Sequence, residues 1–332
     1  MITTKMLLKR CATLLIAGGL LAPMAAQAET LRFAGNFPAD HSSSRAMEIF
    51  QQELAKHDDL DLDAQLFPAM QLGGAQENVD QVRSGAIAGT WIGTAYLSRI
   101  VPQLEAVSLP FAFDNRQQAF NLIDGPVGDT FNKLLADKGF VALGYMELGF
   151  RNVTNNEHPI ETADDLQGLK IRLQPNETHI ETFRDLGANP VSMDVSEVYS
   201  ALQQGVVDGQ ENPYSIIATS RFNEVQKYLS DTQHFFDYIL VVANKGRFDA
   251  LSDAQQQAVR EAMNKAVAWQ REQAAKDDES ARQALIDRGM VFTSISDDTR
   301  EDLRERTSGV IDSLKQKLGA HIVDQVEAEL QQ

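Results

Sequence analysis

The order of apolar and polar positions predicts short strands that alternate with amphipathic helices along most of the chain. Strands are predicted over residues 31–34, 59–64, 86–89, 139–145, 169–173, 206–209 and 235–243. Helices are predicted over residues 42–56, 76–84, 126–138, 176–186, 196–204 and 252–288. Because strands and helices alternate, the fold class is predicted to be α/β.

One local pattern occurs twice, far apart in the sequence. The predicted helices that end at Gly85 and at Gly205 are each followed by three strand-like residues and a second glycine, Gly89 or Gly209. A glycine at a helix C-terminus supplies the left-handed backbone conformation that other residues resist. The repeat predicts two similar α/β lobes. The helix over 252–288 is too long for one small lobe, at about 1.5 Å per residue, and is predicted to bridge the two.

The first 28 residues have the pattern of a secretory signal peptide. Three basic residues precede an apolar run over residues 14–26, and the Ala-Gln-Ala sequence at 26–28 is a small-x-small cleavage site. No later stretch is apolar for long enough to cross a bilayer. The mature chain is therefore predicted to begin after Ala28 and to be a soluble protein of the periplasm.

The sequence contains no motif typical of catalysis or metal binding. Its one cysteine, Cys11, lies within the predicted signal peptide, so the mature chain is predicted to form no disulfide and no thiolate metal site. The six histidines lack metal-ligand spacing, and no nucleophile elbow, zinc-protease helix or glycine-rich phosphate loop occurs. We therefore expect no metal and no cofactor. The same observations lower the expectation of an enzyme without excluding one.

The charge balance argues against nucleic acid or an anionic membrane surface as a partner. The full chain carries 30 basic and 47 acidic side chains, a net charge of −17. The predicted signal peptide holds three of the basic residues and none of the acidic ones, which leaves 27 against 47, or −20, in the mature chain. Such a chain repels polyanions. It remains compatible with a small anionic ligand, because a buried arginine acts locally.

Two arginines beside predicted strands are candidates for binding an anion. Arg172 lies between Ile171 and Leu173, in a strand that a parallel α/β sheet would cover on both faces. A buried guanidinium is costly unless it is paired, and its planar fork fits a carboxylate with two parallel hydrogen bonds. Arg151 follows another predicted strand. Each arginine admits two interpretations, a contact with a ligand or a pair with an internal carboxylate.

Polar and aromatic residues near strand ends add further candidates. Asn212 lies just past a predicted strand, where α/β folds bind ligands, although a polar turn before a helix is the alternative. Asp194 and Glu197 have the spacing of a capping box, so Asp194 is predicted to be a helix N-cap. The aromatic candidates, which belong either to a cleft or to the core, are Trp91, Tyr214 and Phe236.

Eight motifs follow one another over essentially the whole mature chain in the order known from a single family. In the first part of the chain they are Phe33-Ala34-Gly35-Asn36-Phe37-Pro38, Gln71-Leu72-Gly73-Gly74, Leu109-Pro110-Phe111 and Gly149-Phe150-Arg151-Asn152-Val153-Thr154-Asn155. In the second part they are Lys170-Ile171-Arg172, Leu186-Gly187-Ala188-Asn189-Pro190, Ser196-Glu197-Val198-Tyr199 and Val207-Asp208-Gly209-Gln210-Glu211-Asn212-Pro213. Together they resemble the DctP-type solute-binding proteins of tripartite ATP-independent periplasmic (TRAP) transporters.

The resemblance implies the two-lobed α/β fold of periplasmic binding proteins, with crossing strands, a long bridging helix and the ligand between the lobes. After a signal peptide over residues 1–28, the first lobe is predicted to comprise residues 29–148 and 238–277. The second lobe is predicted to comprise residues 149–237 and 278–332.

The resemblance also implies where a ligand is bound. The arginine of the K-I-R motif binds the ligand carboxylate in most members and corresponds to Arg172. The arginine of the G-F-R motif assists it and corresponds to Arg151, and the asparagine of Q-E-N-P corresponds to Asn212. The first lobe is expected to face the cleft around Gly93. The complete set of predicted ligand-binding residues is Arg172, Arg151, Asn212, Asn36, Trp91, Thr94, Val195, Tyr214 and Phe236.

The chain departs from the family's pattern beside the predicted cleft. Met193-Asp194-Val195 stands where many sugar-acid-binding members carry a proline or alanine followed by an aromatic residue, so Val195 takes the stacking position. Asp194 and Asp237 add negative charge near the cleft. These departures keep a zwitterion or an amine open as the ligand.

The predicted function is that of a TRAP substrate-binding subunit for a small organic acid, either a sugar acid, a hydroxy acid or a dicarboxylate. The carboxylate is expected to dock on Arg172 and the lobes to close around it. The expected partners are this carboxylate and the membrane permease, and the protein is expected to be a monomer. A periplasmic enzyme and a sensory binding protein on the same scaffold are the alternatives.

Overall fold

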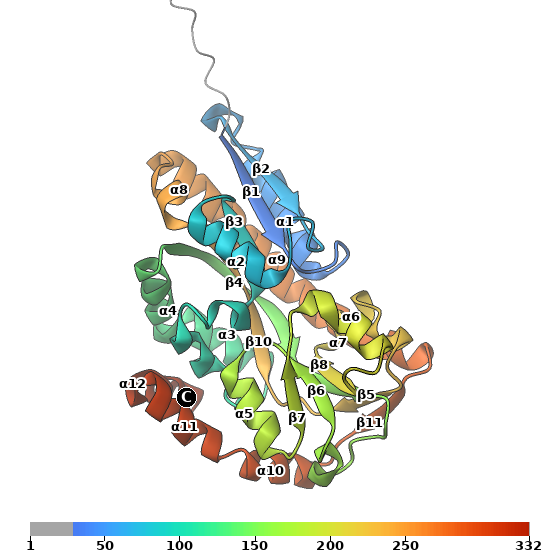
Figure 1. The fold of residues 1–332 in the computed structure, drawn as a ribbon. Helices are drawn as coiled ribbons and strands as arrows, with labels where there is room; N and C mark the ends of the chain where they lie inside the picture. The colour runs from blue at the N-terminus through green and yellow to red at the C-terminus, as the bar shows by residue number, and fades with distance from the viewer. Residues whose placement is uncertain (1–28, 332) are drawn as a thin grey trace, which may run out of the picture.

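The structure, a computed structural model, describes residues 29–331, which form two α/β lobes (Figure 1). The predicted fold class and the predicted pair of similar lobes are confirmed. The predicted signal peptide over residues 1–28 lies outside the described residues. Within residues 29–331, no helix is both long enough and apolar enough to cross a membrane.

The first lobe is built on a five-stranded sheet. Its strands are β1 (Glu29–Gly35), β2 (Leu62–Phe67), β3 (Gly89–Gly93), β4 (Phe140–Phe150) and β10 (Phe236–Asn244). They follow the order β2-β1-β3-β10-β4, in which β1 is parallel to β2 and β3 while β10 is antiparallel to β3 and β4. β2 begins later than the strand predicted over 59–64, because residues 58–60 form a 3-10 helix.

The second lobe is built on a six-stranded sheet. Its strands are β5 (Asn152–Asn155), β6 (Lys170–Leu173), β7 (Asn189–Ser192), β8 (Gly209–Asn212), β9 (Tyr228–Asp231) and β11 (Val291–Ser294). They follow the order β11-β9-β5-β8-β6-β7, in which β6 is parallel to β7 and β8 while β5 is antiparallel to β8 and β9. Each sheet thus contains three parallel strands followed by one antiparallel strand, which is the same arrangement twice.

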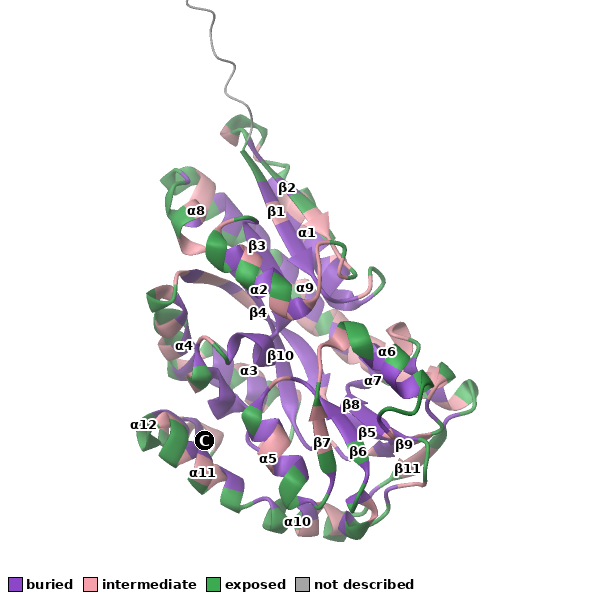
Figure 2. Ribbon diagram, in the orientation of Figure 1, coloured by how far each residue is buried: buried purple, intermediate pink, exposed green. Residues whose placement is uncertain are grey.

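Helices cover the sheets, so the strands are largely buried and the outer helix faces are exposed (Figure 2). The helices are α1 (Ser42–Leu54), α2 (Ala75–Ser84), α3 (Arg116–Asp124), α4 (Pro126–Asp137), α5 (Glu177–Asp185), α6 (Val195–Gln203), α7 (Tyr214–Thr219), α8 (Lys245–Asp249), α9 (Asp253–Asp287), α10 (Asp297–Arg306), α11 (Gly309–Leu318) and α12 (Ala320–Leu330). In α1, for example, Met47, Phe50 and Leu54 are spaced three or four residues apart and all are buried. Such spacing places apolar side chains on one helix face.

The predicted bridging helix is confirmed as α9, which spans 35 residues and is therefore about 50 Å long. Ser252 and Gln255 form a capping box at its N-terminus. The helix contacts α1 and β4 of the first lobe and α7 of the second (Figure 1). A single rigid element therefore passes along both lobes.

The chain also crosses between the lobes at two neighbouring points. β4 leads into β5 through Arg151, and β9 leads into β10 through residues 232–235. β4 and β10 pair with each other, so the crossings lie side by side. The predicted lobe boundaries stay a prediction: α11 and α12 fall in the range predicted for the second lobe, yet both contact the 3-10 helix at Pro102–Val107, and α12 contacts α3 and α4.

Two predicted strands begin later than the sequence suggests. Strands are predicted over 86–89 and 206–209, whereas β3 begins at Gly89 and β8 at Gly209. Ala86 and Val206, directly after the first glycine of each pair, complete the preceding helix, whereas Ala88 and Asp208 already donate to the carbonyls of Arg32 in β1 and Lys170 in β6. The predicted repeat of helix, glycine and strand is present in both lobes, with each strand shifted toward the C-terminus.

The hydrogen bonds at the helix ends explain this shift. Gly85 and Gly205 have left-handed backbones, with φ of +77° and +68°. The next residues, Ala86 and Val206, each donate their N–H to a helix carbonyl five residues earlier, at 2.9 Å in both cases. This is the Schellman arrangement, which satisfies the last helix carbonyls and leaves these N–H groups unable to pair with a neighbouring strand.

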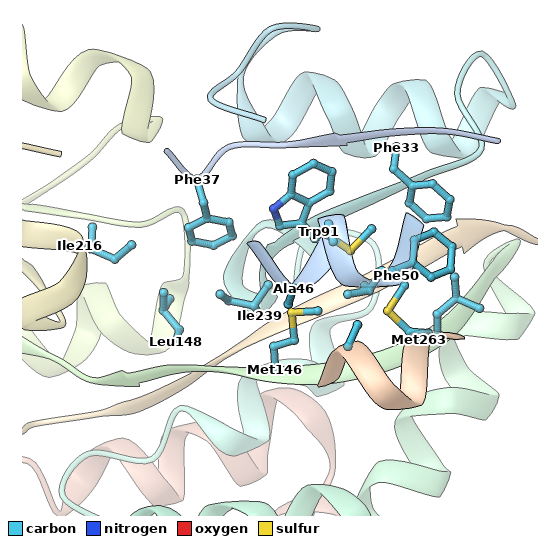
Figure 3. Packing of buried hydrophobic residues seen from close by; sticks show 14 of the residues in the cluster. Phe33, Phe37, Ala46, Phe50, Trp91, Met146, Leu148, Ile216, Ile239 and Met263 are labelled. Carbon is cyan, nitrogen blue, oxygen red and sulfur yellow. The ribbon is translucent and has the colours of Figure 1, made fainter. Parts of the chain in front are cut away.

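The core of the first lobe places Trp91 against the backbone of β1 (Figure 3). A Cβ atom at Gly35 would lie 2.1 Å from the Trp91 ring, so only glycine fits there. Phe33 and Phe50 meet edge to face nearby, with ring centroids 5.4 Å apart. Trp91 is fully buried in this packing, which makes it a core residue of the sheet.

The glycine that opens β8 provides a test of the close packing between strands. A Cβ at Gly209 would lie 2.1 Å from the carbonyl oxygen of Thr154, whereas nothing lies within 4 Å of the corresponding position at Gly205. We expect Gly209→Ala to lower the free energy of unfolding by about 3 kcal/mol, because overpacking forces the backbone to move. Gly205→Ala is the matched control and should cost about 1 kcal/mol, for its left-handed backbone. Urea unfolding measures both; equal costs would contradict the packing argument.

Candidate functional site

A small cavity lies between the two lobes and is lined equally by both. The first lobe contributes Asn36, Phe37, Pro38, Gly93, Tyr96 and Leu148. The second lobe contributes Arg172, Gln174, Val195, Asn212, Ile216 and Ser220. The cavity measures about 20 Å³, so the lobes stand close together. A larger hollow of about 620 Å³ near α3 and Glu329 is open and contains no arginine or lysine among its lining residues.

Arg172 occupies the middle of β6 and is 1% exposed. Its Nε and Nη2 atoms donate to the backbone carbonyl of Met193, at 3.1 and 2.7 Å, and Nη2 also donates to the Tyr96 hydroxyl at 3.2 Å. Within residues 29–331, Nη1 has no acceptor and no carboxylate forms an ion pair with this guanidinium. Of the two interpretations of Arg172, the internal ion pair is therefore not observed.

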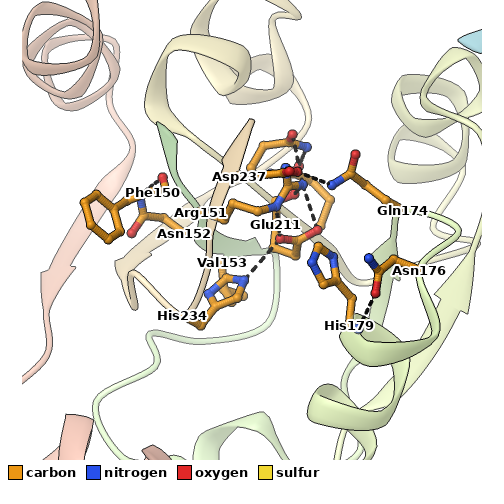
Figure 4. A network of polar contacts seen from close by, with 12 residues as sticks. Phe150, Arg151, Asn152, Val153, Gln174, Asn176, His179, Glu211, His234 and Asp237 are labelled. Atoms are coloured by element: carbon orange, nitrogen blue, oxygen red, sulfur yellow. Dashed lines mark hydrogen bonds and ion pairs between the residues drawn. The ribbon is translucent and has the colours of Figure 1, made fainter. Parts of the chain in front are cut away.

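Arg151, by contrast, is engaged by internal carboxylates at the crossing between the lobes (Figure 4). It is 0% exposed, and its Nε and Nη2 atoms donate to both carboxylate oxygens of Glu211, with Nη2 to Oε1 at 2.8 Å. Its Nη1 atom donates to Asp237 at 3.2 Å, and Nη2 also donates to the Asn212 side chain at 3.1 Å. Arg151 does not line the cavity. These contacts favour the internal pairing of Arg151.

Burial and the neighbouring charges together set the protonation states of the residues in this network. Burial alone would raise the pKa of the Glu211 carboxyl, but the adjacent Arg151 guanidinium and a hydrogen bond from His234 outweigh burial and hold that pKa well below its usual value. Burial lowers the pKa of His234, so its ring is neutral, and its Nε2 donates to Glu211 at 3.1 Å. Burial likewise lowers the pKa of His179 to about 4. The described residues hold no cluster of three or more potential metal ligands.

Asp237 connects this network to the edge of the cavity. Its carboxylate accepts hydrogen bonds from Arg151, from the Thr94 hydroxyl at 2.8 Å and from Gln174 Nε2 at 2.8 Å. Thr94 therefore points to Asp237 and does not line the cavity. Because a carboxylate can only accept, Gln174 must present Nε2 to Asp237 and leave its Oε1 atom toward Gly93.

Four of the predicted ligand-binding residues line the cavity, namely Arg172, Asn212, Asn36 and Val195. Asn212 donates to Gln210 at 2.6 Å and accepts from Arg151, so its amide orientation is determined by both neighbours. Asn36 is buried and its Oδ1 atom has no hydrogen-bond partner among the described residues. Contacts of these four residues with a ligand stay a prediction.

The predicted aromatic residues lie in the core and do not line the cavity. Trp91 packs on β1, as described above. The Tyr214 hydroxyl donates to Asp231 at 2.7 Å, and its ring packs near Phe292. Phe236 belongs to an aromatic cluster that includes Phe113, Phe120, Phe150 and Tyr238. Of the two interpretations of these aromatics, core packing is the one that the structure favours.

Asp194 joins the two lobes through helix ends. The predicted N-cap is confirmed, because its Oδ1 accepts from the Ser196 N–H of α6 at 3.0 Å. Its Oδ2 accepts from the Gln76 N–H of α2 at 3.4 Å, and the N-cap of α2 is Gly74, which has no side chain to offer. One carboxylate thus faces the positive ends of two helices, one from each lobe. Both Asp194 and Asp237 have internal partners, so neither is reserved for an ammonium group.

Sequence reasoning missed several residues of the cavity wall. Gln174 lies two positions after Arg172 and directly past the end of β6, and period-two alternation continued by one residue would have placed both side chains on one face. Tyr96 follows β3, and burial raises the pKa of its hydroxyl, which stays protonated. The other missed residues are Phe37, Pro38, Leu148, Ile216 and Ser220. Nothing in the local sequence distinguishes the apolar residues among them from core residues.

Comparison with known proteins places the chain among bacterial solute-binding proteins. Residues 33–317 match the family model of bacterial extracellular solute-binding protein, family 7. The chain is 36% identical over 260 residues to the 2,3-diketo-L-gulonate-binding periplasmic protein YiaO of Escherichia coli, a match that covers 78% of each chain.

Two solved structures are similar over almost their whole length. The sugar acid binding protein DctPAm of Advenella mimigardefordensis, in complex with galactonate, has a TM-score of 0.89 and 32% identity, and the match covers 92% of this chain and 98% of that one. A TRAP periplasmic solute binding protein of Sulfurospirillum deleyianum with bound succinate has a TM-score of 0.86 and 27% identity, covering 90% and 98%. The similarity therefore extends through both lobes.

The buried pair of Arg151 and Glu211 predicts a specific loss of stability. We expect Glu211→Gln to lower the free energy of unfolding at pH 7 by about 3–5 kcal/mol, because it leaves a buried guanidinium short of one carboxylate. Since the pKa of Glu211 is lower in the folded protein than its ordinary value of 4.5, the stability that wild type gains from the ionised carboxylate is fully present above pH 4.5. It decreases progressively as the pH falls from 4.5 toward the lower pKa of the folded protein.

Urea unfolding at pH 7 and at pH 3.5 measures this difference, with Glu197→Gln on the exposed face of α6 as the matched control. The gap between wild type and Glu211→Gln should narrow at the lower pH. A gap of the same size at both pH values, or a control that behaves like Glu211→Gln, would show that the pair does not act as described.

Proposed function

Because the chain belongs to family 7 of the bacterial extracellular solute-binding proteins, the DctP-type binding proteins of TRAP transporters, we propose that it captures a small organic acid in the periplasm. It does so as a monomer, after cleavage of its signal peptide, and delivers the acid to a membrane permease. The observation that carries this proposal is the guanidinium of Arg172, which borders the cavity between the lobes without a carboxylate partner. The relatives are binding proteins, which is consistent with a chain that is not an enzyme.

The geometry of Arg172 suits a carboxylate ligand. Its Nη1 atom is free to donate, and the Tyr96 hydroxyl at Nη2 is a 3.2 Å contact that a carboxylate oxygen can replace. The bonds to the Met193 carbonyl hold the guanidinium plane in place from the opposite side. Preorganised in this way, the two Nη atoms can take a carboxylate with parallel charge-assisted hydrogen bonds.

The contacts between the lobes support capture by closure. Tyr96 of the first lobe accepts hydrogen bonds from Arg172 and from the Val195 N–H of the second lobe, both at 3.2 Å. Asp194 and Gln76 form another bond across the same gap. Because the cavity is narrow and lined by both lobes, a ligand enters only when the lobes stand further apart. Movement at the neighbouring β4–β5 and β9–β10 crossings provides that opening.

Replacing Arg172 tests the carboxylate contact. We expect Arg172→Ala to weaken binding of the ligand by two to four orders of magnitude, since removing one partner of a buried charge pair costs about 3–5 kcal/mol. The ligand is first released from the purified protein and identified by mass spectrometry, and calorimetry then measures its affinity.

Two variants sharpen this experiment. Arg184→Ala removes an exposed arginine from α5 and should leave the affinity unchanged. Arg172→Lys keeps the charge but loses the planar fork, and should bind more weakly than wild type and more tightly than Arg172→Ala. An unchanged affinity in Arg172→Ala would overturn the assignment of the carboxylate site.

Closure itself predicts a change of shape. We expect small-angle scattering to show a smaller radius of gyration when saturating ligand is added, because the two lobes approach each other around it. Arg172→Ala at the same ligand concentration is the control and should stay at the ligand-free value. A radius that does not change in the wild-type protein, with saturation confirmed by calorimetry, would argue against closure.

A further inference from the structure

We infer that the cavity selects hydroxylated monocarboxylates and rejects dicarboxylates. The inference deepens the proposed function and rests on it, because it takes Arg172 as the partner of the ligand's carboxylate. The related structures leave the choice open, since one contains galactonate and another succinate. Charge and hydrogen bonding around the cavity decide between the two classes.

The first argument is the number of cations at the cavity. Among the described residues that line it, Arg172 is the one that carries a charge. A monocarboxylate is neutralised fully by this guanidinium. The second carboxylate of a diacid would be desolvated between the lobes without a cation to receive it, and an unpaired buried charge is strongly disfavoured.

The second argument is the sign of the charge behind the cavity. Arg151 would be the natural second cation, but the carboxylates of Glu211 and Asp237 both contact it and outnumber it. Two neighbouring histidines, His179 and His234, are buried and neutral. The network therefore presents a net negative charge to the cavity and repels a second carboxylate of the ligand.

The third argument comes from the hydrogen-bond acceptors of the residues that line the cavity. Gln174 is held with its Nε2 atom on Asp237, so its Oε1 atom remains on the side of Gly93, which lines the cavity. Asn36 Oδ1 is buried without a partner among the described residues. A buried acceptor without a partner, such as Asn36 Oδ1, gains from a donor on the ligand, and Gln174 Oε1 can accept from the same ligand. A hydroxyl group supplies a donor, whereas a carboxylate supplies only further acceptors.

The apolar residues of the cavity wall indicate that the ligand also has an apolar face. Phe37, Leu148, Val195 and Ile216 line the cavity beside these polar groups. They fit the C–H faces of a carbon chain whose hydroxyls point to Gln174. The preferred ligand thus carries one carboxylate, at least one hydroxyl donor and a chain with an apolar face.

Pairs of acids that differ in one terminal group test the inference. The full mature protein is first unfolded and refolded to remove any bound ligand. Calorimetry compares D-gluconate with D-glucarate, D-galactonate with galactarate, and glycerate with tartronate, since each pair differs by one terminal CH₂OH or carboxylate. In a pair that binds, we expect the monoacid to bind at least about tenfold more tightly. A diacid that binds as tightly as its monoacid, or three pairs that all fail to bind, overturns the inference.

Other outcomes would contradict the proposed function itself, independently of this inference. Sorbitol, galactitol and glycerol are the uncharged counterparts of the acids, and binding of these as tight as that of the acids would contradict the need for a carboxylate. The same holds if Arg172→Ala leaves the affinity for the monoacid unchanged. Either result would contradict the proposed function, whatever the ratio of the affinities for monoacid and diacid.

Two variants test the source of the discrimination. Asp237→Asn removes one negative charge with little change of shape, and the ratio of monoacid to diacid affinity should fall about tenfold. Gln174→Lys adds a cation beside Asp237 and should raise the affinity for the diacid about tenfold. Asp249→Asn, an exposed site on α8, is the control and should leave the ratio unchanged. An unchanged ratio in both Asp237→Asn and Gln174→Lys contradicts the charge argument.

Discussion

The buried ion network at Arg151 is the interaction on which the rest of this structure depends. Arg151 is the residue at which the chain passes from β4 to β5, and its partners Glu211 and Asp237 belong to β8 and β10. One guanidinium thus ties both crossing strands to the sheet of the second lobe. Because these charges are fully buried, separating any of them from its partners is costly, so the ion network holds the crossing strands to one another.

This network also explains why Arg172 has no carboxylate partner among the described residues. The two carboxylates nearest the crossing are already committed to Arg151, so Arg172 has only the carbonyl of Met193 and the hydroxyl of Tyr96 as acceptors. A guanidinium buried with neutral partners is incompletely compensated. In the function that we propose, the anion supplies this missing charge, and the energy of its contact with Arg172 helps to hold the lobes together.

The lobes are joined by elements with different mechanical roles. The helix α9 passes along both lobes as one continuous element, and the paired crossings beside it are short. Across the cavity, by contrast, the contacts are single hydrogen bonds, such as those of Tyr96 and Asp194. Such bonds are individually weak and re-form with water when the lobes separate. In the closure that we propose, a modest amount of ligand-binding energy therefore suffices to favour the closed arrangement over an open one.

The sequence by itself determined the local features, because they depend on residues close together in the chain. The length of α9, the N-cap at Asp194, the repeated glycine ends of α2 and α6, and the place of Arg172 in an apolar strand were all predictable from spacing. The family and its two-lobed fold followed from motifs of the same local kind.

The tertiary structure alone decided which side chains meet. Arg151 and Arg172 are alike in the sequence, and they differ because Glu211, 60 residues from Arg151, is brought to it by the pairing of β5 with β8. Trp91 belongs to the core and Gln174 to the cavity for the same reason. Periodicity shows which face of an element is buried, but the residues that cover that face come from strands distant in the sequence.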